Sequence, residues 1–256
     1  MKRTFRIGRL SCPPRPLLCA VVALAVTSAS EAAADDGPGP FGVTRVAAAT
    51  AQSARVGALF DADRGGGPGG HFCTASVVRS PRHDLLVTAA HCLDGGGDLL
   101  FVPGWRDGRA PYGIWKVGRR YLPDGWAGGQ DEDSDVAFAT LEDRGGQGVE
   151  DTVGGNRFAA GVATGATAVT VTGYPNSREA PVSCTNKPTA HSRTQQRIEC
   201  PDLTGGTSGS PWVNGDGQVV GVLGGHEQGG ATADISYSVV LGAEADELYR
   251  DATADR

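Results

Sequence analysis

The chain has 256 residues, of which 39% are apolar, 39 are glycines and one is a methionine. This length allows one large domain, and many glycines between short apolar runs favour turn-rich β structure over a helical bundle. The formal net charge is −6. Beyond the first 34 residues the sequence has no basic patch, so a nucleic acid is not expected as a partner.

The N-terminus has the order of a secretory signal peptide. Basic side chains are concentrated in residues 2–15, an apolar run fills residues 17–26, and small residues dominate 27–34. This order is typical of signal peptides. The alternative, a membrane anchor, is disfavoured because a bilayer span needs about 20 apolar residues. Residues 1–34 are therefore predicted to direct secretion, leaving an extracellular protein without membrane association.

The remaining chain reads as a linker followed by one β domain. Residues 35–54 are rich in glycine, proline, alanine and serine, and are predicted to be a linker or short propeptide without a core of its own. Residues 55–256 are predicted to form the domain, with halves at about 55–143 and 150–256 on either side of a glycine-rich stretch.

Short β-like runs alternate with turns through this domain, and residues 243–252 predict one final helix with Leu248 and Tyr249 facing inward. The runs are residues 56–60, 72–78, 85–90, 114–122, 135–141, 167–174, 196–200, 210–213, 217–225 and 235–241. Many short strands with frequent turns indicate an all-β barrel or sandwich.

Four cysteines remain after the signal peptide: Cys73, Cys92, Cys184 and Cys200. An even number in a secreted chain favours two disulfides, for which three pairings exist. Proximity in sequence favours Cys73–Cys92 and Cys184–Cys200. No CxxC spacing or histidine cluster supports a metal site, so neither a metal nor an organic cofactor is expected.

Three short segments carry candidate catalytic residues: TAAHC with His91, DSDVAF with Asp135, and GGTSGSPW with Ser208. A serine hydroxyl is a weak nucleophile that needs a base within hydrogen-bond reach. Histidine suits that role because its pKa lies near neutral pH, and a buried carboxylate can hold its tautomer. These three residues are therefore predicted to form a catalytic triad.

The choice of Asp135 competes with three other acidic residues in the same loop, Asp131, Glu132 and Asp133. A run of acidic residues is usually a solvated surface. Asp135 is preferred because it directly precedes the apolar run VAFATL, where a carboxylate would lie buried at a strand end.

Glycines surround Ser208, so the backbone can turn sharply and approach a substrate closely. The N–H groups of Gly206 and Ser208 are predicted to form an oxyanion hole for the tetrahedral intermediate. An ordinary turn serine is the alternative for an isolated motif of this kind, and the upstream TAAHC segment argues against it.

TAAHC, DVAF and GGTSGSPW, in this order, resemble the chymotrypsin-like (trypsin-like) serine peptidases. The resemblance spans about residues 55–252 and is closest to small secreted actinobacterial and glutamyl-endopeptidase-like members. It implies an all-β fold of two six-stranded antiparallel β-barrels with a C-terminal helix. It also implies a secreted serine endopeptidase that hydrolyses peptide bonds through an acyl-enzyme intermediate on Ser208.

One departure from the family concerns the residue before the nucleophile. Many members have an aspartate there, which pairs with a new N-terminus after zymogen cleavage, whereas this chain has Thr207. Only Arg55-Val56-Gly57 loosely resembles such a start. The oxyanion hole is therefore predicted to be held by the Gly205–Ser208 turn, independently of an exact mature N-terminus.

The sequence gives conflicting indications about the preferred substrate residue. Asp202 has the offset of a basic-side-chain selector in trypsin-type enzymes, although a structural role in its loop is favoured. His226 follows the strand expected to line the cleft. In glutamyl endopeptidases, which the chain resembles, a histidine near this strand helps to bind an acidic substrate side chain. Leu223 occupies the matching position here, and His226 lies three residues beyond it. Gly224 and Gly225 would open the pocket to large side chains. No cleavage preference is predicted.

The remaining histidines, His71, His83 and His191, are expected at the surface or in loops. The expected partners are protein or peptide substrates and a protein inhibitor, and the protein is expected to be a monomer. Two other functions remain open: an esterase-like hydrolase with the same triad, and a non-catalytic binding module that retains the fold.

Overall fold

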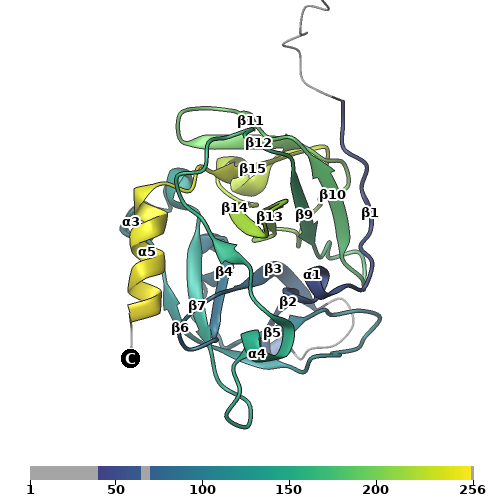
Figure 1. The fold of residues 1–256 in the computed structure, drawn as a ribbon, viewed down its shortest axis with the longest axis vertical. Helices are drawn as coiled ribbons and strands as arrows, with labels where there is room; N and C mark the ends of the chain where they lie inside the picture. Colours follow the sequence, from purple (N-terminus) through teal and green to yellow (C-terminus); the bar gives the residue numbers. More distant parts are fainter. Residues whose placement is uncertain (1–39, 65–69, 255–256) are drawn as a thin grey trace, which may run out of the picture. The chain divides into compact units, whose positions relative to one another are not determined.

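The computed structural model describes residues 40–64 and 70–254 (Figure 1). The predicted signal peptide lies outside these residues. Within them, no helix is both long and apolar enough to cross a lipid bilayer.

The first half forms a closed β-barrel in which neighbouring strands run antiparallel. Its strands follow the order β2-β3-β4-β7-β6-β5 around the barrel. They are β2 (Val56–Asp61), β3 (His71–Val78), β4 (Leu85–Thr88), β5 (Leu99–Pro103), β6 (Trp115–Tyr121) and β7 (Ala137–Leu141).

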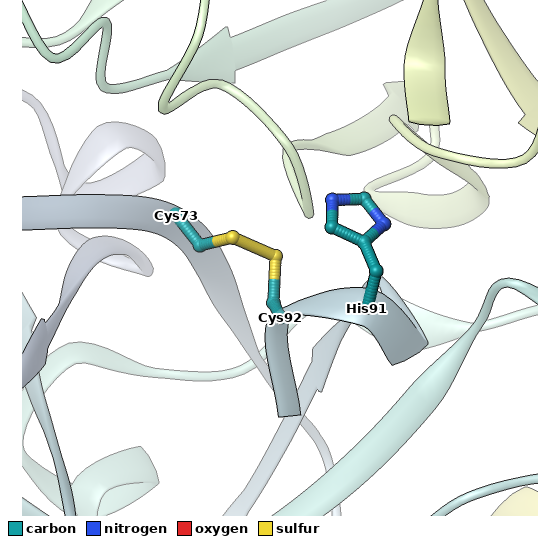
Figure 2. A group of neighbouring side chains, drawn as sticks. All are labelled: Cys73, His91 and Cys92. Carbon is teal, nitrogen blue, oxygen red and sulfur yellow. A yellow bond between two sulfur atoms is a disulfide. The ribbon is translucent and has the colours of Figure 1, made fainter. Parts of the chain in front are cut away.

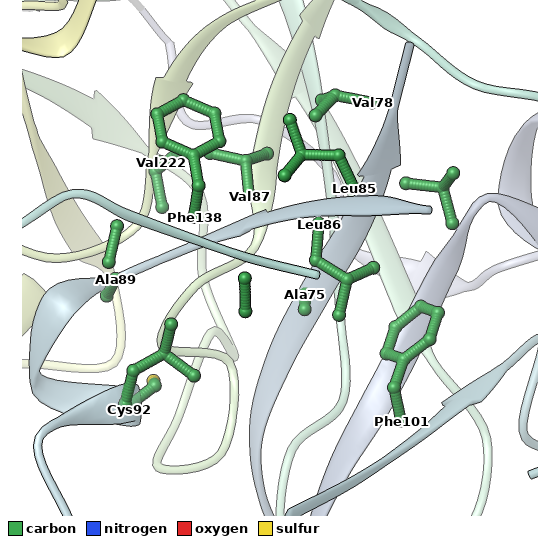
Figure 3. Packing of buried hydrophobic residues seen from close by; sticks show 14 of the residues in the cluster. Ala75, Val78, Leu85, Leu86, Val87, Ala89, Cys92, Phe101, Phe138 and Val222 are labelled. Carbon is green, nitrogen blue, oxygen red and sulfur yellow. The ribbon is translucent and has the colours of Figure 1, made fainter. Parts of the chain in front are cut away.

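Apolar side chains fill this barrel and continue into the second half. Leu86, Phe101 and Phe138 are at most 1% exposed (Figure 3). Val222 of the second half belongs to the same buried cluster. Burial of apolar area is the main driving force for such packing, at about 25 cal/mol per Å². The two halves are therefore joined by a continuous core.

The second half consists of two sheets. The larger has the order β1-β10-β9-β13-β14-β8, and the smaller has the order β11-β12-β15. Their strands are β1 (Arg45–Val46), β8 (Arg157–Phe158), β9 (Val169–Gly173), β10 (Val182–Asn186), β11 (Thr189–Ala190), β12 (Gln195–Glu199), β13 (Pro211–Asn214), β14 (Gln218–Val222) and β15 (Ile235–Val239). The predicted closure of a second six-stranded barrel is not confirmed.

Some backbone groups of these strands have partners outside the strand ladders. The carbonyl of Glu199, at the end of β12, accepts from the Gly42 N–H at 2.8 Å and from Asn186 Nδ2 at 2.8 Å. Between β14 and β15, the Val222 N–H donates to the Ser238 hydroxyl at 2.9 Å. Side chains and the N-terminal segment thus satisfy backbone groups that the strand ladders leave unpaired.

The segment 40–54 differs from the linker that composition predicts. Its strand β1 pairs with β10, and the Ala47 N–H donates to the Pro181 carbonyl at 2.8 Å. Arg106 of the first half donates to the Ala47 carbonyl at 2.6 Å. A short helix, α1 (Ala51–Ala54), follows and begins with a capping box at Thr50. Hydrogen bonds, together with burial of Ala47 and Ala54, make these residues part of the folded domain.

The final helix, α5 (Ala243–Ala254), packs against β7 and β6 of the first barrel (Figure 1). Tyr249 lies against Phe138 and Phe158, with ring centroids 5.5 and 4.9 Å away. Leu248 also packs on this core, as its helical spacing predicts. The other helices are α2 (Ala90–Leu93), α3 (Asp124–Gly129) and α4 (Val149–Val153), with 3-10 turns η1 (Ala62–Arg64), η2 (Glu132–Ser134) and η3 (His226–Gly229).

Candidate active site

Pairing of β4 with β7 brings His91 and Asp135 together. Thr88 at the end of β4 lies opposite Ala137 at the start of β7. His91 follows in the short helix α2, and Asp135 ends the 3-10 turn that leads into β7. His91 Nδ1 lies 2.7 Å from Asp135 Oδ2. Two residues 44 positions apart are thus hydrogen-bonded because their strands are neighbours in the barrel.

Asp135 is fully buried, and three hydrogen bonds compensate its carboxylate. Oδ1 accepts from the His91 backbone N–H at 3.0 Å, and Oδ2 accepts from the Gly225 N–H at 2.7 Å as well as contacting His91 Nδ1. A buried charge needs such partners. The other acidic residues of this loop, Asp131, Glu132 and Asp133, are exposed. The carboxylate is therefore positioned to hold Nδ1 protonated and Nε2 free.

The loop around Ser208 has the left-handed backbone that its glycines permit. Gly206 has φ +97° and Gly209 has φ +83°. The Gly209 N–H donates to the Leu223 carbonyl at 2.7 Å, and the Ser208 carbonyl accepts from the Thr74 N–H at 2.7 Å. Among the described residues, the Ser208 hydroxyl makes no hydrogen bond, and the N–H groups of Gly206 and Ser208 have no acceptor. Catalytic hydrogen bonds are often long in unliganded enzymes and shorten when substrate binds.

The Ser208 loop packs on the end of β4, which leads to His91, and Gly224, which follows β14, packs on Asp135. A Cβ atom at Gly209 would lie 2.1 Å from Thr88 Oγ1, at the end of β4. A Cβ atom at Gly224 would lie 2.6 Å from Asp135 Oδ2. Glycine is required at both places because a Cβ atom would overlap these neighbouring side chains. The histidine, the aspartate and the serine loop therefore meet at the junction of the two halves.

The two disulfides have the predicted pairing, Cys73–Cys92 and Cys184–Cys200. The first links Cys73 of β3 to Cys92, which lies in the same short helix as His91 (Figure 2). Together with His91 its sulfurs form the cluster of potential metal ligands found among the described residues. Sulfurs bonded to each other are not thiolates, which are the form that binds zinc. This disulfide is therefore a structural link beside the histidine.

Two further features border His91. The Trp126 indole lies 6.3 Å from the imidazole, measured between ring centroids. A cavity of about 320 Å³ opens beside the imidazole, with Phe72 and Leu99 among its lining residues. Sequence patterns single out neither feature, because both depend on how loops from separate strands meet.

The predicted substrate-binding residues occupy different environments. Leu223 is buried, and Gly224 and Gly225 contact Asp135 as described above. His226 Nδ1 lies 3.5 Å from Glu132 Oε2. Asp202 is exposed in a turn with φ +63° and makes no hydrogen bond with the residues that the structure describes. Of these five residues, the two glycines are the ones that touch the Asp135 carboxylate.

Two histidines expected at the surface have specific neighbours. His71 is 2% exposed, and its Nε2 lies 3.1 Å from the Pro175 carbonyl. The His191 ring lies 4.7 Å from that of His226, and both rings lie 4.8 Å from Tyr237. The prediction for His71 is wrong because β3 begins in the interior, between the Phe60 and Tyr174 rings.

Sequence reasoning also missed two residues behind the serine loop, Thr74 and Asn176. The Thr74 hydroxyl donates to the Gly206 carbonyl at 3.0 Å. The Asn176 N–H donates to the Gly205 carbonyl at 2.7 Å. The position of Thr74, directly after Cys73, is the signal that could have indicated the first of them.

Comparison with known proteins agrees with this geometry. The trypsin-like peptidase domain matches residues 73–222, and the chain belongs to this family. A search of curated protein sequences found no match.

Several solved structures are similar to this one. The protease Anisep from Arthrobacter nicotinovorans is 27% identical, with a TM-score of 0.70, over 83% of this chain and 100% of that protein. The thermostable serine protease AL20 from an extremophilic microorganism is also 27% identical, with a TM-score of 0.69, over 81% of this chain and 100% of that one. A Glu endopeptidase at 19% identity, with a TM-score of 0.66 over 85% and 99% of the two chains, shares the fold. The comparisons support a peptidase with a chymotrypsin-like fold.

Proposed function

We propose that the protein is a secreted serine endopeptidase with His91, Asp135 and Ser208 as its catalytic triad. The observation that carries the proposal is the 2.7 Å contact between His91 Nδ1 and the fully buried carboxylate of Asp135. A buried aspartate beneath a histidine holds the imidazole in the tautomer that a general base needs. The imidazole itself remains partly accessible, with 16% of its side chain exposed.

In the proposed reaction, Ser208 Oγ attacks the carbonyl carbon of the scissile peptide bond while His91 Nε2 takes its proton. The tetrahedral intermediate expels the amine, which receives that proton from His91, and an acyl-enzyme remains on Ser208. Water then attacks the ester carbonyl while His91 takes one of its protons. Collapse of the second intermediate releases the carboxylic acid and returns the proton to Ser208 Oγ.

The free N–H groups of Gly206 and Ser208 suit the negative oxygen of both intermediates. Donors fixed before the reaction stabilise such charge without reorganisation, and one donor contributes about 3 kcal/mol to transition-state stabilisation. All the groups that this chemistry requires belong to the chain itself.

Secretion is proposed from the predicted signal peptide and the two disulfides, because disulfides persist in oxidising compartments. Peptides or proteins are the substrates that a peptidase fold implies. The similar structures include a serine protease and a Glu endopeptidase, but the latter shares only the fold, so no preferred residue is proposed. The proposed enzyme acts as a monomer, and a protein inhibitor is its further proposed partner.

Hydrolysis by the Ser208→Ala variant tests this proposal. The purified wild type should digest casein, whereas Ser208→Ala should lose at least about 10³-fold in kcat and keep its thermal unfolding temperature. Ser177→Ala, a substitution at an exposed loop serine, is the matched control and should keep full activity. Unchanged casein digestion by Ser208→Ala would contradict the proposal.

The same assay separates the two alternatives. An esterase would turn over small esters and leave casein intact. A binding module would hydrolyse neither, and human heparin binding protein, 13% identical with a TM-score of 0.60, has this fold and a name that refers to binding. The hydrogen bond between the partly exposed His91 and the buried Asp135 carboxylate favours a catalytic function, since a binding module has no need of a buried carboxylate.

A further inference from the structure

Three carbonyl groups of the Ser208 loop are held by donors outside the loop. The Gly205 carbonyl accepts from the Asn176 N–H at 2.7 Å, and the Ser208 carbonyl accepts from the Thr74 N–H at 2.7 Å. The Gly206 carbonyl accepts from the Thr74 hydroxyl at 3.0 Å. Thr74 thus binds the loop on both sides of Thr207.

The bond to the Gly205 carbonyl determines the direction of one proposed oxyanion donor, the Gly206 N–H, and the two bonds from Thr74 hold the carbonyls on either side of the Thr207–Ser208 peptide, which carries the other. In a trans peptide the C=O and N–H groups point to opposite sides of the plane, and the described residues contain no cis peptide. With the Gly205 carbonyl held by Asn176, the Gly206 N–H points away from Asn176. Rotation of this peptide would turn the N–H away from the substrate and would break the bond to Asn176. The donor is therefore fixed by a contact on the opposite side of the loop.

The Thr74 hydroxyl bonds both to the segment that carries Asn176 and to the Ser208 loop. It accepts from the Tyr174 N–H at 2.9 Å, and an N–H can only donate, so the hydroxyl proton is directed to the Gly206 carbonyl. Thr74 is 0% exposed, so water cannot replace either bond. Loss of a buried partner leaves the remaining groups unsatisfied, which is costly. One side chain from β3 therefore connects the Tyr174–Asn176 segment to the Ser208 loop.

The residue before Ser208 makes no such connection. Thr207 is 1% exposed, and its hydroxyl donates to the Thr204 carbonyl at 2.7 Å, within the loop. Thr207 is neutral, so this position offers no carboxylate to pair with a chain terminus. Support for the loop must come from elsewhere, and Thr74 is the side chain that supplies it.

We infer that Thr74 is a positioning residue that holds the oxyanion hole in its active conformation. The inference rests on the proposed function. It adds that hydrogen bonds from the uncharged Thr74 hold the oxyanion hole, in place of an ion pair formed by a new N-terminus. Because these hydrogen bonds do not involve a chain terminus, the enzyme needs no cleavage at a particular position to form its oxyanion hole.

Three variants of wild-type length test the inference. Thr74→Val keeps the shape of the side chain and removes the hydroxyl, whereas Thr74→Ser keeps the hydroxyl. Thr140→Val is the control, since it removes a buried hydroxyl that accepts from the Arg119 N–H in the first barrel. The measurements are kcat and KM on a peptide substrate, inhibition by a peptide aldehyde, and the thermal unfolding temperature.

Thr74→Val should lower kcat by about 10²-fold, the effect of one oxyanion donor, with little change in KM. The aldehyde forms a tetrahedral adduct, so its inhibition constant should rise by a similar factor. Thr74→Ser should restore most of kcat. The inference is overturned if Thr74→Val keeps kcat and only lowers the unfolding temperature, as Thr140→Val would. A wild type without peptide hydrolysis would instead refute the proposed function.

A second pair of variants applies if Thr74→Val does not fold. The Arg178 N–H donates to the Pro175 carbonyl at 2.9 Å, which makes Asn176 the second residue of a β-turn. Proline suits that position and lacks an N–H. Asn176→Pro should therefore lose kcat, whereas Asn176→Ala, which keeps the N–H, should retain it. Equal activity of these two exposed-loop variants would overturn the inference.

Discussion

Asp135 contacts both the ring and the backbone of His91, with Oδ2 2.7 Å from Nδ1 and Oδ1 3.0 Å from the backbone nitrogen. The carboxylate therefore fixes both the orientation and the position of the imidazole. Asp135→Asn should keep the fold but favour the wrong tautomer, and kcat should fall by about 10⁴-fold. Asp133→Asn, in the same loop but exposed, should retain activity. Steady-state kinetics on one peptide substrate compare them, and equal losses would contradict the assignment of Asp135.

Gly224 has no room for a side chain beside the Asp135 carboxylate. A Cβ atom would lie 2.6 Å from Oδ2 and 3.1 Å from Ala89 Cβ, and both neighbours are buried. Gly224→Ala should displace the carboxylate and lower kcat by about 10-fold or more. Gly215→Ala is the control, because nothing lies within 4 Å of its Cβ position. Full activity of Gly224→Ala would contradict the claim that catalysis depends on the exact position of the Asp135 carboxylate.

The N-terminal segment should be required for folding stability, whereas activity should not depend on the exact residue at which the chain begins. Chains that begin at Asp35 or Pro40 should have equal unfolding temperatures and equal kcat. A chain that begins at Ala48 loses β1 and the bonds of Gly42 and Ala47, so its unfolding temperature should fall. Differential scanning fluorimetry measures this shift. A sharp requirement of kcat for one starting residue would argue against an oxyanion hole that is independent of the N-terminus.

The exposed pair of His83 and Asp151 should stabilise the fold in a defined pH range. A 2.6 Å hydrogen bond to Asp151 raises the pKa of His83 above 6.5, and the same bond lowers the pKa of Asp151 below 3.8. The contribution of His83 is complete below pH 6.5 and is lost as pH rises through its raised pKa. That of Asp151 is present above pH 3.8 and is lost as pH falls through its lowered pKa. The pair should therefore contribute most between these values.

Thermal unfolding of His83→Asn at two pH values checks this prediction. Asparagine suits the left-handed backbone at this position, where φ is +59°. The variant should be destabilised relative to wild type at about pH 5 and much less at about pH 9. Arg82→Gln, which removes the neighbouring pair with Asp84, should show no such change over this range. An equal difference at both pH values would contradict a stabilising contribution that depends on protonated His83.

Local patterns predicted the parts of the molecule that depend on short segments. Five of the six strands of the first barrel carry apolar runs that the sequence analysis names, whereas β5 (Leu99–Pro103) was missed, and Cys73–Cys92 joins residues close in sequence. The contact between His91 and Asp135 was predicted through the order of motifs. The structure supplies its cause, the pairing of β4 with β7.

Long-range hydrogen bonds explain what the sequence could not reveal. The segment 40–47 has the composition of a linker, yet backbone bonds to Pro181 and Glu199 make it part of the sheet. Backbone donors and acceptors are present in every sequence, so composition does not disclose their partners. The same reason conceals Thr74 and Asn176.

Covalent labelling tests the central claim most directly. A fluorophosphonate reacts with an activated serine, and peptide mapping by mass spectrometry locates the adduct. The account predicts one adduct per chain on Ser208, with labelling much slower in His91→Ala and unchanged in His191→Ala. An unlabelled wild type, or an adduct on any other serine, would contradict it.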